Sequence, residues 1–85
     1  MKIILESKSQ GSRGDWGYKK RYALDLFEVS SGKSVVEISW GRAELWYSRQ
    51  RKQHTFDDSF LASLFIDEQV DKQIKKGYEI VATNP

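Results

Sequence analysis

Basic and aromatic residues are interleaved in two parts of this sequence. The first part is the run Lys19-Lys20-Arg21, which lies between Tyr18 and Tyr22. The second part holds four cations around an aromatic pair: Arg42, Arg49, Arg51 and Lys52, with Trp46 and Tyr47. Cationic side chains neutralise phosphates, and ring faces stack on bases or sugars, so the two clusters predict a nucleic-acid-binding surface. Exposed strands also carry Lys, Arg and aromatic residues for solubility and strand propensity alone, which is the competing interpretation.

The charge is unevenly distributed along the chain. Residues 1–54 contain 11 Lys/Arg and 6 Asp/Glu, a net charge of +5, and residues 55–85 contain 3 Lys and 6 Asp/Glu, a net charge of −3. The whole chain therefore carries only +2. This distribution favours a polyanion facing the first two thirds of the chain while the acidic part faces away from it.

The sequence offers few groups for catalysis. His54 is the only histidine and there is no cysteine, so neither a catalytic triad nor a thiol nucleophile is indicated. Asp57 and Asp58 are adjacent carboxylates, but such pairs at a helix start usually cap the helix. Gly32-Lys33-Ser34 ends like a P-loop without the glycine five residues earlier. We therefore expect no enzyme activity, cofactor, metal site or small-molecule substrate.

Length and composition predict one small domain. The chain has 85 residues, and its 39% hydrophobic content is enough for a single core. The absence of cysteine favours the cytoplasm over secretion. No apolar run approaches the roughly 18 residues that a membrane span needs, so we expect no membrane partner. We expect a single domain over residues 1–85, with its core at about 18–82 and a flexible loop at 10–15.

Alternating apolar residues predict four strands before a helix. They cover residues 1–9, 18–29, 34–40 and 43–53. The turn at 30–33 joins the second strand to the third, and Gly32 is available there for a positive φ. In the fourth strand, Arg49 and Arg51 point to one side and Lys52 to the other. We therefore favour Arg49 and Arg51 as a contacting pair, with Lys52 at the rim.

The pattern becomes helical after residue 56. Apolar residues recur four positions apart over residues 57–76, with Asp57 as the expected N-cap and Gly77 as the C′ glycine. Phe56 and Leu61 would form a hydrophobic staple, and a short strand over 78–81 would follow. The expected fold is α+β, with one long α-helix packed on one face of an antiparallel or mixed β-sheet. The expected core contains Leu24, Leu26, Ile38, Leu61, Phe65 and Ile74.

The run Ser39-Trp40-Gly41-Arg42 resembles the motif of the WGR domain, a module of DNA-dependent poly(ADP-ribose) polymerases and of many bacterial proteins. The context is similar as well. An alternating strand and a hairpin precede the motif, and a basic strand follows it. Phe56 then opens a helix that ends in Lys75-Lys76-Gly77-Tyr78. The resemblance covers about residues 18–82.

The resemblance implies a WGR-like fold and a role at DNA ends. In the polymerases this module contacts DNA near a strand break and touches neighbouring domains. Carried onto this chain, Trp40 becomes the residue that stacks on a terminal sugar or base, and Arg42 the contact to a phosphate or a partner domain. Gly41 between them has no side chain to bar close backbone approach. The alternative for Trp40 is that it extends the core face of Val36 and Ile38.

Two functions are therefore predicted. The first is a non-catalytic module that binds DNA, or RNA, at ends or along the phosphate backbone without sequence specificity. Its expected binding residues are Lys19, Lys20, Arg21, Trp40, Gly41, Arg42, Arg49, Arg51, Lys52 and Tyr78. The alternative is a protein-interaction module that docks a partner through an apolar, weakly salt-dependent surface around Trp46 and Tyr47.

Overall fold

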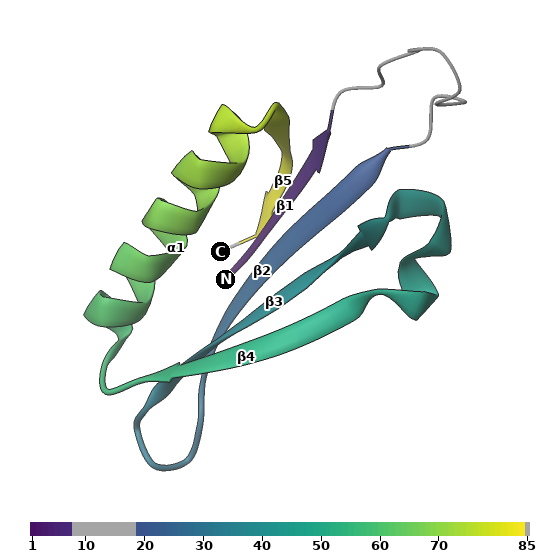
Figure 1. Cartoon of the computed structure of the whole chain (residues 1–85). Helices are drawn as coiled ribbons and strands as arrows, with labels where there is room; N and C mark the ends of the chain where they lie inside the picture. Colours follow the sequence, from purple (N-terminus) through teal and green to yellow (C-terminus); the bar gives the residue numbers. More distant parts are fainter. Residues whose placement is uncertain (8–18, 85) are drawn as a thin grey trace.

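The computed structural model describes residues 1–7 and 19–84, and within these ranges it contains five strands, a short 3₁₀ segment and one α-helix (Figure 1). The elements in chain order are β1 (Lys2–Ser7), β2 (Lys20–Glu28), β3 (Ser34–Arg42), η1 (Ala43–Ser48), β4 (Gln50–Phe56), α1 (Ser59–Lys75) and β5 (Tyr78–Asn84). The loop expected at 10–15, and Tyr18 with it, lies outside the described residues. The α+β class with an antiparallel sheet and one long helix is confirmed.

The five strands form one sheet in the order β4-β3-β2-β1-β5, and every neighbouring pair is antiparallel. The β2–β3 hairpin turns where the sequence predicted it, with Gly32 at a φ of 87°. Because β4 and β5 lie at opposite edges of the sheet, α1 has to carry the chain across its whole width. The helix does so over one face of the sheet, as Figure 1 shows.

The core lies where α1 crosses the middle strands. Alternation in β2 and β3 turns Leu24, Val36 and Ile38 to the helix side, where they are buried with Leu5 of β1. From the helix, the fully buried Ala62 and the nearly buried Ile66 complete this cluster. A small side chain at residue 62 lets the helix backbone approach the sheet closely, which tightens the packing.

Two residues of the expected core, Leu61 and Ile74, are instead exposed, at 43% and 46%. Helical positions advance by about 100° per residue, so the buried face centres on Ala62, Ile66 and Gln73, and both residues fall on its flanks. Leu24 and Ile38 are buried as expected. Leu26 and Phe65 are partly buried against the core. The pattern of large apolar residues does not predict the centre of the buried face, because Ala62 is small and Gln73 is polar.

The expected strand at 43–53 is wrong in its first half. Ala43–Ser48 form η1, which is kinked at Leu45 (φ −118°, ψ 37°), and β4 begins only at Gln50. The local sequence favours a strand because it contains Trp46 and Tyr47. A tertiary contact overrides that preference, since the Trp46 ring packs against the guanidinium groups of Arg21 and Arg49.

The helix begins one residue later than expected. Asp58, rather than Asp57, is the N-cap, and its Oδ1 accepts a hydrogen bond from the Leu61 amide at 2.9 Å. The predicted staple between Phe56 and Leu61 is therefore out of position, and the Phe56 ring packs on Phe65 with centroids 5.1 Å apart. The helix ends as predicted, with Gly77 at a φ of 102° directly after the C-cap.

The burial pattern predicts a clear difference between two leucine-to-alanine substitutions. Leu24→Ala removes a side chain that is 1% exposed, and we expect a loss of about 2–5 kcal/mol in unfolding free energy. Leu61→Ala removes one that is 43% exposed, and we expect a loss below about 1 kcal/mol. Urea unfolding of both variants measures the two losses. Equal losses would contradict the observed placement of α1 on the sheet.

Candidate nucleic-acid interface

The expected motif residues lie at the end of the sheet where β2 begins and β3 ends. The register pairs Tyr22 with Trp40, and Lys20 with Arg42. Because alternate residues of a strand share a face, all four lie on the helix side of the sheet. Lys20, Trp40 and Arg42 border a hollow of about 310 Å³, which we call the strand-end hollow and which Gly41 and Tyr78 also line. Five of the ten predicted binding residues are thus brought together.

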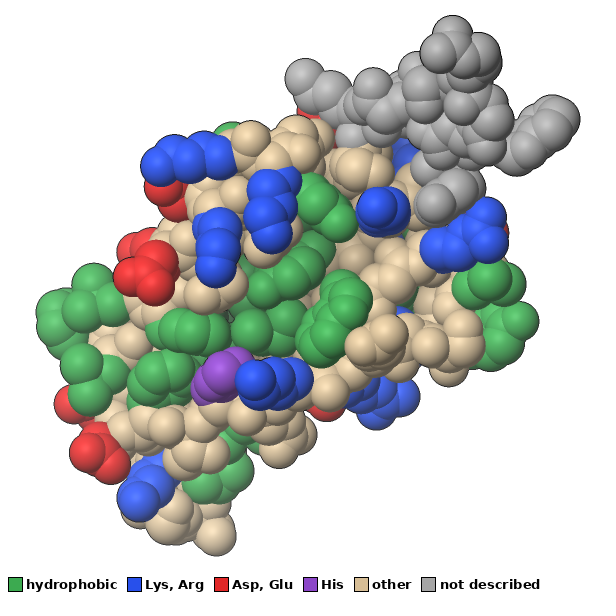
Figure 2. All heavy atoms as spheres, viewed as in Figure 1, with side chains coloured by type: hydrophobic (Ala, Val, Ile, Leu, Met, Phe, Trp, Pro, Cys, Tyr) green, Lys and Arg blue, Asp and Glu red, His purple; other side chains and the backbone are tan. Residues whose placement is uncertain are grey.

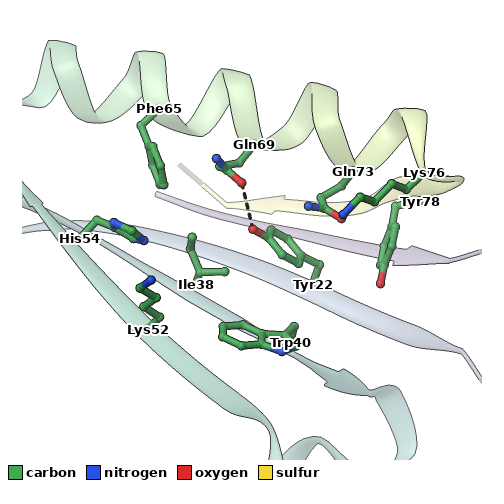
Figure 3. Close-up of a pocket in the computed structure, with 10 residues that line it drawn as sticks. All are labelled: Tyr22, Ile38, Trp40, Lys52, His54, Phe65, Gln69, Gln73, Lys76 and Tyr78. Atoms are coloured by element: carbon green, nitrogen blue, oxygen red, sulfur yellow. Dashed lines mark hydrogen bonds between the residues drawn. The ribbon is translucent and has the colours of Figure 1, made fainter.

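A larger groove adjoins this hollow, between α1 and the sheet (Figure 3). This helix–sheet groove has a volume of about 420 Å³. The strands contribute Tyr22, Ile38, Trp40, Lys52 and His54, and the helix and the residues after it contribute Phe65, Gln69, Gln73, Lys76 and Tyr78. In Figure 3 the two sets point toward each other across the groove. Because Trp40 and Tyr78 line both spaces, the hollow and the groove form one continuous surface.

Among the residues that the structure describes, the lining of both spaces has cationic groups and no carboxylate. Lys20 and Arg42 stand at the hollow, and Lys52 and Lys76 at the groove. The Arg42 Nε lies 3.7 Å from a Glu44 oxygen, in a pair whose side chains are both about half exposed. Such an exposed pair is weak, so Glu44 by itself competes little with a phosphate for the guanidinium. In Figure 2, hydrophobic side chains lie in the middle of this face with Lys and Arg side chains around them.

Three of the other predicted cations gather on the opposite face of the sheet. Arg21 and Arg49 both lie against the Trp46 ring, each with its guanidinium carbon 5.1 Å from the ring centroid. Arg21 also pairs with Glu6 at 2.9 Å, and Lys19 lies 3.9 Å from the same carboxylate. Arg49 donates a hydrogen bond to the Trp46 carbonyl oxygen at 3.0 Å. These contacts hold Arg21 and Arg49 in place and partly neutralise this side.

Arg51 and Lys52 are adjacent on β4 but face opposite ways. Arg51 is paired with Ser39, which lies on the face away from the helix, whereas Lys52 is paired with Ile38 and lines the groove. The expected separation of Lys52 from Arg51 is thereby confirmed. We expected Arg49 and Arg51 to point to the same side of one strand. Only Arg51 is in β4, because Arg49 precedes the strand and its guanidinium packs on the Trp46 ring.

Sequence reasoning missed the polar side chains that α1 contributes to the groove. Gln69 and Gln73 are four residues apart on the buried face of the helix, and Gln73 is only 6% exposed. The Tyr22 hydroxyl donates a hydrogen bond to Gln69 Oε1 at 3.3 Å. Their spacing in the sequence could have indicated this role, because it places both amides on the helix face that also carries Ile66 and Val70.

Burial raises the pKa of the Tyr22 hydroxyl above its usual value of 10.0. The nearby Tyr78, whose ring centroid is 6.3 Å away, raises the pKa of Tyr22 further, and the Gln73 side chain lowers it in part. Burial also raises the pKa of Tyr78. Both phenols are therefore neutral near pH 7 and add no negative charge to the groove.

The raised pKa of Tyr22 predicts a loss of stability in alkali. The unfolded chain releases this proton first, so the stabilisation is complete below about pH 10 and is lost as the pH rises through the folded pKa. Tyr22→Phe removes the titrating group, and we expect a smaller fall in unfolding free energy between about pH 8 and pH 10.5. Urea titrations at both pH values measure the two falls. If the parent and the variant lost the same amount, the environment assigned to Tyr22 would be wrong.

Other kinds of site have little support in the part of the chain that the structure describes. There, no group of three or more His, Cys, Asp or Glu side chains is placed to hold a metal ion. No described helix combines the length and apolarity needed to cross a membrane. Comparisons of the chain with protein-family models, with curated proteins and with solved structures found no match.

Proposed function

We propose that this chain is a non-catalytic module that binds nucleic acid, most simply a DNA end or its phosphate backbone, at the strand-end hollow. Trp40 and Tyr78 supply aromatic surface there, and Lys20 and Arg42 supply positive charge. A phosphate beside Arg42 would accept hydrogen bonds from the planar guanidinium, and an adjacent sugar or base would lie on Trp40. These roles agree with those that the WGR resemblance implies for Trp40 and Arg42.

The observation that supports the proposal most directly is the pairing of Lys20 with Arg42 beside Trp40. Two antiparallel strands place both cations at the same end of the sheet and on the same face. No carboxylate is among the described residues that line the hollow, so an anion entering it meets no like charge from them. Positive charge next to an aromatic surface is the combination that a nucleotide chain requires.

The arrangement of the strands changes which cations we assign to the interface. The sequence predicts Arg49 and Arg51 as the contacting pair, but Arg51 faces away from the hollow and Arg49 packs against Trp46. A ligand seated on Trp40 reaches them only by passing around the edge of the sheet. We therefore place Lys20, Arg42 and Lys52 in the primary contact, and Lys19, Arg21, Arg49 and Arg51 in a secondary one.

A salt titration tests the proposed function. A short duplex with a 5′-phosphate and a fluorescent label would be titrated with the protein between about 50 and 200 mM salt. We expect the logarithm of the binding constant to fall linearly with the logarithm of salt concentration, because each neutralised phosphate releases counterions. Binding that is absent, or that does not depend on salt, would refute the proposal.

Arg42→Lys tests the motif arginine. The variant keeps the charge but loses the planar fork that can give a phosphate two hydrogen bonds. We expect affinity for a 5′-phosphorylated end to fall about tenfold, or about 1.4 kcal/mol, with a smaller fall when the phosphate is absent. The melting temperature should change little, because lysine keeps the positive charge at this exposed position.

The control is Lys33→Gln, which removes one positive charge at the hairpin between β2 and β3, at the other end of these strands. It should lower affinity only by a weak, general electrostatic effect. If Arg42→Lys left binding to both kinds of end unchanged, Arg42 would not contact the phosphate. If it lowered the melting temperature without DNA, its role would be structural.

The alternative function is docking of a protein partner at η1. Tyr47 is 82% exposed there and Leu45 is also exposed, which is the observation that favours it. Trp46 is less available than the sequence suggested, because it lies against Arg21 and Arg49. An interface centred on Tyr47 would be weakly dependent on salt and would be lost in Tyr47→Ala. The same substitution should leave DNA affinity nearly unchanged, because η1 does not line the hollow.

A further inference from the structure

The helix–sheet groove has the size and chemistry of a binding site for a flat, anionic ligand. Its volume of about 420 Å³ lies within the range of small-ligand pockets, which is roughly 300–1,000 Å³. Aromatic side chains form much of its walls, and Lys52 and Lys76 bring two positive charges. Because the described lining residues include two lysines and no carboxylate, a ring that carries a phosphate fits the groove better than a cationic or neutral one.

The groove also has a fixed group for hydrogen bonding. The Tyr22 hydroxyl donates to Gln69 Oε1 at 3.3 Å, which orients the amide (Figure 3). Because the Gln69 oxygen is engaged by Tyr22, its amide nitrogen is the group that it can offer to a ligand. An amide N–H donates to carbonyl oxygens and ring nitrogens, and nucleic-acid bases carry such acceptors on their edges.

The position of Trp40 connects the groove to the strand-end hollow. Trp40 and Tyr78 line both spaces, and the cations Lys20 and Arg42 lie on the far side of Trp40 from the groove residues Gln69 and Lys52. A nucleotide that spans Trp40 can therefore leave its phosphate in the hollow and place its base in the groove. A base that remains paired and stacked in a duplex cannot do this, because its ring is enclosed by its neighbours.

We infer that the helix–sheet groove is a subsite for one unpaired base, so that the module prefers DNA ends with a single-stranded overhang to blunt ends. This inference rests on the proposed function and deepens it by naming the form of the ligand. In the bound state, the base stacks against Trp40, Gln69 donates a hydrogen bond to its edge, and Lys52 lies near the next phosphate. Recognition of this kind tolerates any base, because every base has a ring face and an acceptor.

Three DNA ends test the inference. They are a blunt 5′-phosphorylated duplex, the same duplex with a two-nucleotide 5′-phosphorylated overhang, and that overhang with abasic sites in place of its bases. We expect the overhang to bind about fivefold or more tightly than the blunt end, since stacking of one base contributes at least this much. The abasic overhang should lose most of the gain, because it keeps the phosphates and lacks the rings.

Matched variants locate the subsite. Gln69→Ala should remove much of the preference for the overhang, and Gln69→Glu should reduce it further, because it keeps the side-chain shape and adds a negative charge. The control is Gln53→Ala, the same change on the face of β4 that points away from the helix. Lys52→Gln and Arg51→Gln form a second pair, in which only the first should weaken binding of the overhang. Melting temperatures verify that each variant is folded.

The outcomes separate the inference from the proposed function. Salt-dependent binding that is equal for blunt and overhanging ends would overturn the inference and leave the proposed function standing. An overhang preference that survives both Gln69 substitutions would also overturn it, because the base would then bind elsewhere. Failure of all three DNAs to bind in a salt-dependent way would overturn both. A preference that is lost in Gln69→Ala and kept in Gln53→Ala would support the subsite.

Discussion

The crossing of one helix over a five-stranded sheet is the constraint on which the rest of this structure depends. Since β4 and β5 lie at opposite edges, α1 must span four strand spacings, about 19 Å. Its 17 residues extend about 26 Å, so it can do so in one piece. A single helix about 10 Å wide cannot cover the whole face of this sheet, whose middle strands β2 and β3 extend about 30 Å at nine residues each. The core forms where the helix crosses, and the groove and the hollow lie where its cover ends.

Strand alternation then divides the cations between the two faces. Lys20, Arg42 and Lys52 fall on the helix side because each is paired with, or two positions from, a residue that faces α1. Arg21 and Arg51 fall on the other side for the same reason. The two faces differ in more than direction, because Glu6 and Trp46 engage Arg21 on one face, while Lys52 borders the helix–sheet groove and Lys20 the strand-end hollow on the other. The excess positive charge of the first 54 residues is therefore divided between two faces and does not form one continuous surface.

The parts that local patterns predicted well are those where one local rule decides the structure. The β2–β3 hairpin follows from alternation and Gly32, and the end of α1 follows from Gly77. The predictions failed where contacts between residues far apart in the sequence determine the structure. Trp46 leaves its expected strand to pack against Arg21, which is 25 residues earlier in the chain. Gln69 joins the groove because Tyr22 of β2 lies opposite it. The hydrophobic pattern of α1 does not indicate Gln69 as a groove residue, because its contact with Tyr22 forms only when the helix packs on the sheet.

Trp40 packs against the core and also borders the candidate site, so the two interpretations of its sequence context are compatible. It continues the inward-facing series of Val36 and Ile38, and it is only half-buried because α1 does not extend over the end of β3. One part of the indole packs on the core, which fixes its orientation, and the rest borders the groove and the hollow. A ring held in this way loses little further rotational freedom when a ligand stacks on it, so more of the stacking energy remains for binding. The same incomplete cover that weakens the core at this end thus gives the surface a rigid aromatic group between two sets of positive charges.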